Sequence, residues 1–127
     1  MDAQIDFFDR GDYLEVVFHG AFSLANHKIQ VPELLKACKR YGKKVAFCDL
    51  TQQKGTMTIV ERYQLGTFVA GFWDRTIRLS ILVHPDHHTA GDLFEDVTHN
   101  RGLNFRVFID RERALAYAHA PEEANQP

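Results

Sequence analysis

The residues that most restrict the fold are Val45-Ala-Phe-Cys48, four apolar residues in succession with no polar residue between them. A strand with one face in water alternates apolar and polar side chains, whereas an unbroken apolar run is typical of a strand covered on both faces. Such a strand lies inside a sheet that has helices packed on either side. We therefore expect an α/β domain with 45–48 as a central strand.

Turn and capping signals divide the rest of the chain into alternating strands and helices. We expect strands at 5–8, 13–19, 45–48, 77–83 and 105–109. We expect helices at about 24–41, at 59–72, from a Thr89 cap to Gly102, and after an Asp110 cap. Within the first helix, Pro32 either introduces a kink or marks a helix that begins near Val31.

The resulting order is ββαβαβαβα, which predicts a single α/β domain with a mixed five-stranded sheet. Strands joined through helices need crossover connections, so the second to fifth strands should be mainly parallel. The first strand then becomes an antiparallel edge partner, joined to the second by a hairpin turn at Asp9-Arg-Gly-Asp12. We place the domain at 1–119 and expect a disordered tail at 120–127, where no apolar residue is larger than Ala.

Length and composition narrow the class of protein further. A chain of 127 residues is the size of one domain, and a net charge of −2 gives no general attraction to nucleic acid or anionic membranes. No apolar run approaches the roughly 20 residues of a membrane span, and the acidic start lacks the pattern of a signal peptide. Cys38 and Cys48 fall in a predicted helix and strand, so we expect free thiols and a cytoplasmic protein.

The sequence contains no motif typical of an enzyme. Its serines are Ser23 and Ser80, neither of which stands in a Gly-x-Ser-x-Gly elbow. Gly66 and Gly71 lie inside a predicted helix, whereas a phosphate loop needs glycines between a strand and a helix. We expect no catalytic activity and no cofactor, and we read Gly66 and Gly71 as positions of close approach by another backbone or a ligand.

Four segments resemble the STAS-like family, the relatives of the anti-sigma-factor antagonist SpoIIAA. The resemblance covers roughly 5–119 and rests on Tyr13-Leu-Glu-Val-Val-Phe-His-Gly20, Val45-Ala-Phe-Cys-Asp-Leu50, Glu61-Arg-Tyr-Gln-Leu-Gly66 and Asn100-Arg-Gly-Leu-Asn-Phe-Arg-Val-Phe108. It implies a regulatory module that works through protein–protein contacts. The same fold group includes the CRAL-TRIO lipid-binding domains, which implies a small apolar ligand as the alternative function.

The chain departs from that family where partner-switching antagonists carry a phosphorylated serine after the central strand. The matching stretch, Asp49 to Thr58, has no Ser-Ser or Ser-Gly pair, so the sequence looks like a divergent SpoIIAA-like branch. Thr56 and Thr58 are the candidate phosphoacceptors. Thr58 is explained more simply as a helix cap, because Thr58-x-x-Glu61 has the form of a capping box.

The helix over 59–73 is apolar on two sides, which is typical of a helix that is buried or shared with a partner. One arc holds Ile59, Val60 and Tyr63, and the opposite arc holds Leu65, Phe68, Val69, Phe72 and Trp73. We expect one flank to pack on the sheet and the aromatic remainder to form an exposed patch, unless C-terminal loops cover it. The predicted interface residues are Tyr63, Phe68, Phe72 and Trp73, and the predicted partner is a second copy of the chain.

Two other kinds of site follow from residues near the predicted strand ends. Five large apolar residues are candidates for lining a lipid or other apolar-ligand pocket: Phe22, Met57, Phe68, Phe72 and Phe94. The run His84-Pro-Asp-His-His88 supplies the candidate metal ligands His84, Asp86, His87 and His88. A solvated loop with Pro-Asp turn chemistry explains this run more simply than a metal site does.

Overall fold

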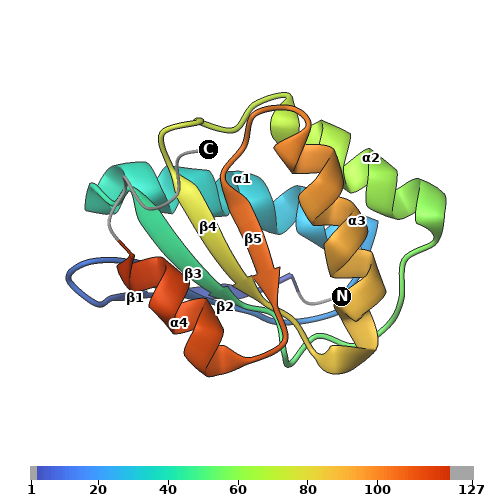
Figure 1. Cartoon of the computed structure of the whole chain (residues 1–127), viewed down its shortest axis with the longest axis horizontal. Helices are drawn as coiled ribbons and strands as arrows, with labels where there is room; N and C mark the ends of the chain where they lie inside the picture. The colour runs from blue at the N-terminus through green and yellow to red at the C-terminus, as the bar shows by residue number, and fades with distance from the viewer. Residues whose placement is uncertain (1–2, 121–127) are drawn as a thin grey trace.

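Five strands form one sheet in the spatial order β1-β2-β3-β4-β5 (Figure 1). The computed structural model describes residues 3–120, so most of the predicted disordered tail lies outside the described residues. The strands are β1 (Ile5–Asp9), β2 (Leu14–Phe18), β3 (Val45–Asp49), β4 (Arg78–Leu82) and β5 (Phe105–Phe108). The helices are α1 (Leu24–Tyr41), α2 (Ile59–Ala70), the single 3₁₀ turn η1 (Pro85–His87), α3 (His88–His99) and α4 (Arg111–His119).

The sheet is mixed, as the sequence predicts. β1 pairs with β2 in the antiparallel sense, and each following pair up to β4–β5 is parallel. The predicted order ββαβαβαβα is therefore confirmed. Because β2 to β5 run in the same direction, all four end at one edge of the sheet and begin at the opposite edge.

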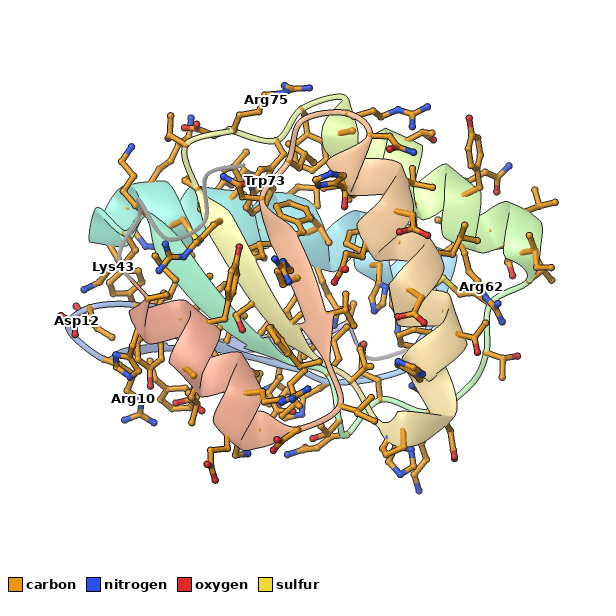
Figure 2. The ribbon with its side chains drawn as sticks, viewed as in Figure 1. Arg10, Asp12, Lys43, Arg62, Trp73 and Arg75 are labelled. Carbon is orange, nitrogen blue, oxygen red and sulfur yellow. The ribbon has the colours of Figure 1, made fainter. Side chains whose placement is uncertain are left out.

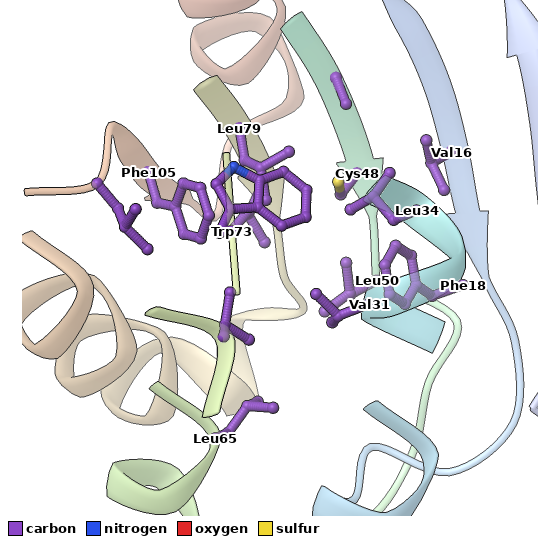
Figure 3. Close-up of a cluster of buried hydrophobic side chains, with 14 of the residues drawn as sticks. Val16, Phe18, Val31, Leu34, Cys48, Leu50, Leu65, Trp73, Leu79 and Phe105 are labelled. Carbon is purple, nitrogen blue, oxygen red and sulfur yellow. The ribbon is translucent and has the colours of Figure 1, made fainter. Parts of the chain in front are cut away.

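Helices cover the two faces of the sheet unequally. α1, α2 and α3 pack over the larger core, while α4 packs on the other face against β3, β4 and β5 (Figure 1). The central strand β3 contributes to both layers, because Ala46 and Cys48 belong to the larger core and Phe47 belongs to the smaller one. Figure 3 shows part of the larger core, with Cys48 beside Leu34 and with Trp73 beside Phe105. The prediction that 45–48 is covered on both faces is confirmed.

Local signals account for most helix ends. The Ser23 hydroxyl accepts from the backbone N–H of Asn26 and begins α1. Gly42 takes a positive φ of 67° and ends it, which a residue with a Cβ adopts only at a cost. α1 is assigned without interruption from Leu24 to Tyr41, so Pro32 lies inside the helix and does not start it.

The start of α3 differs from the prediction. We expected 84–88 to be a loop and Thr89 to be the cap, but Pro85 opens the 3₁₀ turn η1 and α3 begins at His88. The residue at the cap position, His87, makes no side-chain capping bond. Proline favours the first turn of a helix because its φ is already helical, so the chain becomes helical earlier than a Thr89 cap would allow.

Both cysteines are buried free thiols, and burial raises the pKa of Cys38 to about 12 and the pKa of Cys48 well above its ordinary value.

Within 3–120, no helix combines the length and the apolar character needed to cross a membrane.

Candidate functional site

α2 packs on the core through the flank that the sequence marked as aromatic. Leu65 and Val69 are buried, and Trp73, just beyond the helix end, is only 3% exposed. The Trp73 Nε1 donates to the carbonyl oxygen of Ile77 at 2.9 Å, and its ring meets Phe105 edge-on. Phe68 and Phe72 are half-buried against the same core. The expectation of an exposed aromatic patch is therefore wrong for Trp73, because Ile77 and Phe105 of the sheet side occupy that position.

The close contact between α2 and α3 explains Gly66. A Cβ placed on Gly66 would lie 2.6 Å from Cγ1 of Val97, so only glycine lets α3 come this close. Gly66 is therefore a position of close approach, but to the side chain of Val97 and not to the backbone or ligand that the sequence suggested. At Gly71 the nearest atoms to such a Cβ are carbonyl oxygens of α2 itself, so the same prediction fails there.

The other flank of α2 carries three large apolar side chains in water. Ile59 is 71% exposed, Val60 is 64% exposed and Tyr63 is 50% exposed. We call these three residues the α2 apolar face. Arg101, just beyond α3, contacts the edge of this face: its Nη2 lies 3.3 Å from the phenol oxygen of Tyr63, and its guanidinium carbon lies 5.7 Å from the ring centroid.

α2 itself contributes no charge to that flank. The helix has two charged residues, Glu61 and Arg62, and both are engaged at its amino-terminal end. Glu61 Oε1 accepts from the backbone N–H of Thr58 at 2.8 Å, and Arg62 Nε donates to the carbonyl oxygen of Met57 at 2.9 Å. Figure 2 shows Arg62 close to the start of α2. The α2 apolar face is thus continued along the helix by the neutral residues Gln64 and Thr67.

The two candidate phosphoacceptors are exposed beside this face. The Thr58 hydroxyl accepts from the backbone N–H of Glu61 at 3.1 Å, which completes the predicted capping box. Thr56 lies in the preceding loop. The capping interpretation of Thr58 is confirmed, and phosphorylation of either residue stays a prediction.

An apolar cavity of about 60 Å³ lies between the sheet and α1, α2 and α3. Three of the predicted pocket residues line it, namely Phe22, Met57 and Phe94, whereas Phe68 and Phe72 do not. Pockets that hold drug-sized ligands measure roughly 300–1,000 Å³. A cavity of this size admits only a small group and not the chain of a lipid.

A buried polar network closes the cavity beside the carboxyl end of β2. His27 Nε2 donates to Gln53 Oε1 at 2.7 Å, and Gln53 Nε2 donates to the carbonyl oxygen of His19 at 2.9 Å. Gln30 Nε2 donates to the same carbonyl at 2.8 Å. Burial lowers the pKa of His27 to about 4, so the imidazole is neutral near pH 7. The network joins α1 to the loop after β3, and its role is structural.

The four predicted metal ligands do not come together. His87 is buried, stacks on Phe22 with ring centroids 3.9 Å apart, and donates from Nε2 to the carbonyl oxygen of Gly55 at 2.7 Å. His84, Asp86 and His88 are exposed. No group of three or more His, Cys, Asp or Glu residues within 3–120 is placed to hold a metal ion. The arrangement gives the metal interpretation of this run no support, because the turn η1 directs His87 into the core while His84 and Asp86 stay at the surface.

Asp49, at the end of β3, forms an ion pair that the sequence did not suggest. Its Oδ2 lies 2.6 Å from Nη2 of Arg111 at the start of α4, and its Oδ1 accepts from the backbone N–H and hydroxyl of Thr51. Burial alone would raise the pKa of Asp49, but the bonds from Thr51 and Arg111 outweigh burial and hold it below its ordinary value. This carboxylate anchors α4, and it belongs to no acidic or metal-binding cluster among the described residues.

Comparison with known proteins informs the fold. No family model matches the chain, and no curated protein matches it. A solved structure of an uncharacterised protein of the DUF3478 family from Shewanella loihica PV-4, which has a SpoIIAA-like fold, superimposes with a TM-score of 0.52. The two sequences are 18% identical, and the match covers 91% of this chain and 92% of that chain. At that identity the match shows the fold alone, and the chain has a SpoIIAA-like fold.

Proposed function

We propose that this protein is a non-catalytic regulatory or binding module that acts through protein–protein contacts and pairs with a second copy of itself through the α2 apolar face. The observation that carries the proposal is the exposure of Ile59, Val60 and Tyr63 on one flank of α2. Large apolar side chains gathered in water are typical of an interaction surface. Of the predicted interface residues, the proposal keeps Tyr63 and replaces Phe68, Phe72 and Trp73 with Ile59 and Val60.

The neutrality of this flank of α2 supports a second copy as the partner. In a two-fold symmetric dimer, each surface meets the same surface of its partner. A charged side chain near the two-fold axis therefore lies opposite an identical charge, which repels it. Glu61 and Arg62 are held by Thr58 and Met57 at the helix start, so α2 itself adds no charge to this flank, and the one cation beside it, Arg101, lies at its edge against Tyr63. Such a helix face is self-complementary without repulsion.

The resemblance to the STAS-like family supports the regulatory part of the proposal, since that family implies function through partner contacts. Thr56 and Thr58 lie directly before the α2 apolar face in the chain, so a phosphate on either would add charge beside it. We propose these threonines as the sites at which such a modification would control association. The apolar-ligand alternative has less support, because the cavity of about 60 Å³ is too small for a lipid chain.

The test is native mass spectrometry of untagged protein and of two matched variants. Ile59→Glu places a charge on the α2 apolar face, and Ile109→Glu places the same charge on an isoleucine that is 47% exposed between β5 and α4. We expect dimers for the native chain and for Ile109→Glu, and monomers for Ile59→Glu. A native chain that is monomeric at tens of micromolar, or an Ile59→Glu variant that stays dimeric, would contradict the proposed interface.

A further inference from the structure

A hollow of about 220 Å³ opens at the edge of the sheet where β3, β4 and β5 begin. This is the edge opposite the α2 start and the buried histidines. Its walls come from residues at or before the starts of these strands, from the end of α4 and from the β1–β2 turn. They include Asp12, Lys44, Arg75, Arg78, Asn104 and His119. Three lysine or arginine side chains and one histidine therefore face a single acidic residue.

Arg78 carries the strongest indication of a missing partner. The residue is only 7% exposed, and its Nη2 donates to the carbonyl oxygens of Ala118 and Ala120 at the end of α4. Its Nε is buried and has no hydrogen-bond partner among residues 3–120. None of the ion pairs formed within that part of the chain includes Arg78, whose guanidinium carbon instead lies 5.3 Å from the ring centroid of Tyr117. A buried guanidinium with no counter-ion is costly, so such groups are normally paired.

The other cationic groups are placed at the rim of the same hollow. Arg75, in the loop before β4 (Figure 2), is held by two hydrogen bonds from Nε and Nη2 to the carbonyl oxygen of Arg101, at 3.2 and 2.9 Å. Lys44 Nζ donates to the Thr76 hydroxyl at 3.1 Å. Neither side chain forms an ion pair with a carboxylate of the described residues, although Asp74 lies near Lys44: its Oδ1 accepts from the same Thr76 hydroxyl, and the bonds from Thr76, helped by the Lys44 charge, lower the pKa of Asp74. At Asp12, the acidic residue at the rim, Oδ2 lies 3.7 Å from Nδ1 of His119.

We propose that this hollow, which we call the anion pocket, binds the phosphate or carboxylate group of a small molecule through Arg78, Lys44 and Arg75. Guanidinium and ammonium groups make their strongest hydrogen bonds to such oxyanions, and arginine suits their planar, paired acceptors. The volume of about 220 Å³ fits a compact anion better than a large cofactor. The site is separate from the α2 apolar face and does not depend on dimer formation.

The same oxyanion chemistry has a second source within the chain. Glu122 and Glu123 follow Ala120 in sequence, and both lie outside the described residues. A carboxylate from either glutamate and a carboxylate or phosphate from a free molecule would compete for the same cations. The experiment must therefore include a variant in which both glutamates are neutral.

The test is a titration of the ¹⁵N-labelled full chain with inorganic phosphate, followed by two-dimensional NMR at constant ionic strength. The pocket variant is Lys44→Gln/Arg75→Gln, which leaves Arg78 and its bonds to α4 in place. The charge control is Lys54→Gln, because Lys54 is exposed and pairs with Ala21 at the opposite edge of the sheet. The third variant is Glu122→Gln/Glu123→Gln.

We expect saturable shifts of the Arg78, Thr76 and Asn104 amides in the native chain. The pocket variant should bind phosphate at least about tenfold more weakly, since two charged donors are lost, and Lys54→Gln should match the native chain. Saturable binding that appears only in Glu122→Gln/Glu123→Gln would support the pocket and assign its occupant to the tail. No saturable shift in any form, or an equal loss in Lys54→Gln and the pocket variant, would overturn the proposal.

Discussion

Nε2 of His27 lies 2.7 Å from Oε1 of Gln53 in the interior of the protein. The pKa of His27 is lowered to about 4 from an ordinary value of 6.5, first because burial disfavours the charged ring and then because His87 lies nearby. As pH falls below 6.5, the unfolded chain binds a proton at His27 that the folded chain does not bind. The free energy of unfolding should therefore fall by about 3 kcal/mol between pH 6.5 and pH 4.

Urea denaturation at several pH values checks this prediction. His27→Gln should lower stability at pH 7 but flatten the dependence between pH 6.5 and 4, because the titrating group is gone. His88→Gln replaces an exposed histidine and should keep the native slope. If the free energy of unfolding of the native chain does not change between pH 6.5 and pH 4, His27 is protonated in the folded protein and the prediction is wrong. The pKa values of Asp6, Asp9, Asp49 and Asp74 are also lowered, so these carboxylates add a further loss of stability that begins at about pH 5 and continues below pH 4.

The contact between Gly66 and Val97 makes the second prediction. Gly66→Ala should destabilise the fold by about 1–3 kcal/mol, because its methyl group would lie 2.6 Å from Cγ1 of Val97 and α2 and α3 would have to separate. Val97→Ala alone should also destabilise, since Val97 is buried. The double variant should be more stable than the sum of the two losses, because the smaller residue makes room for the added methyl. If the double variant instead loses as much unfolding free energy as the two single variants together, in thermal or urea unfolding, then α2 and α3 move apart freely and the contact does not restrict them.

The capping box at the start of α2 gives the third prediction. Thr58→Ala removes the acceptor for the backbone N–H of Glu61 and should cost about 1 kcal/mol of unfolding free energy. Thr56→Ala, two residues earlier in an exposed loop, is the matched control and should change stability by less than about 0.5 kcal/mol. Equal effects of the two substitutions in urea denaturation would mean that the cap does not stabilise α2.

The architecture was predictable because each element carries its own local signal. The unbroken apolar run at 45–48 indicates a strand covered on both faces, and Ala46, Phe47 and Cys48 are all buried. Ser23 and Thr58 mark helix starts through their own hydroxyl groups. These signals depend on residues a few positions apart, so they can be read without knowledge of tertiary contacts.

The site was harder to predict because it depends on which flank of a helix is covered. α2 is apolar on two sides, and only the tertiary packing, such as the contact of Trp73 with Phe105 of β5, decides that Trp73 is buried while Ile59 and Tyr63 face water. The buried network had a readable signal that was missed, since His27 and Gln30 extend the apolar stripe of Val31 and Leu34 along α1. No signal in the sequence indicated the unpartnered Nε of Arg78, because its surroundings depend on how α4 ends over the start of β4.

The central claim, that two copies pair through the α2 apolar face, is tested most directly by sedimentation equilibrium of the untagged native chain over about 1–100 µM, a range that brackets a micromolar dissociation constant. The account predicts a mass that rises with concentration toward twice the 14.6 kDa of one chain. A mass that stays at that of one chain over the whole range would contradict it.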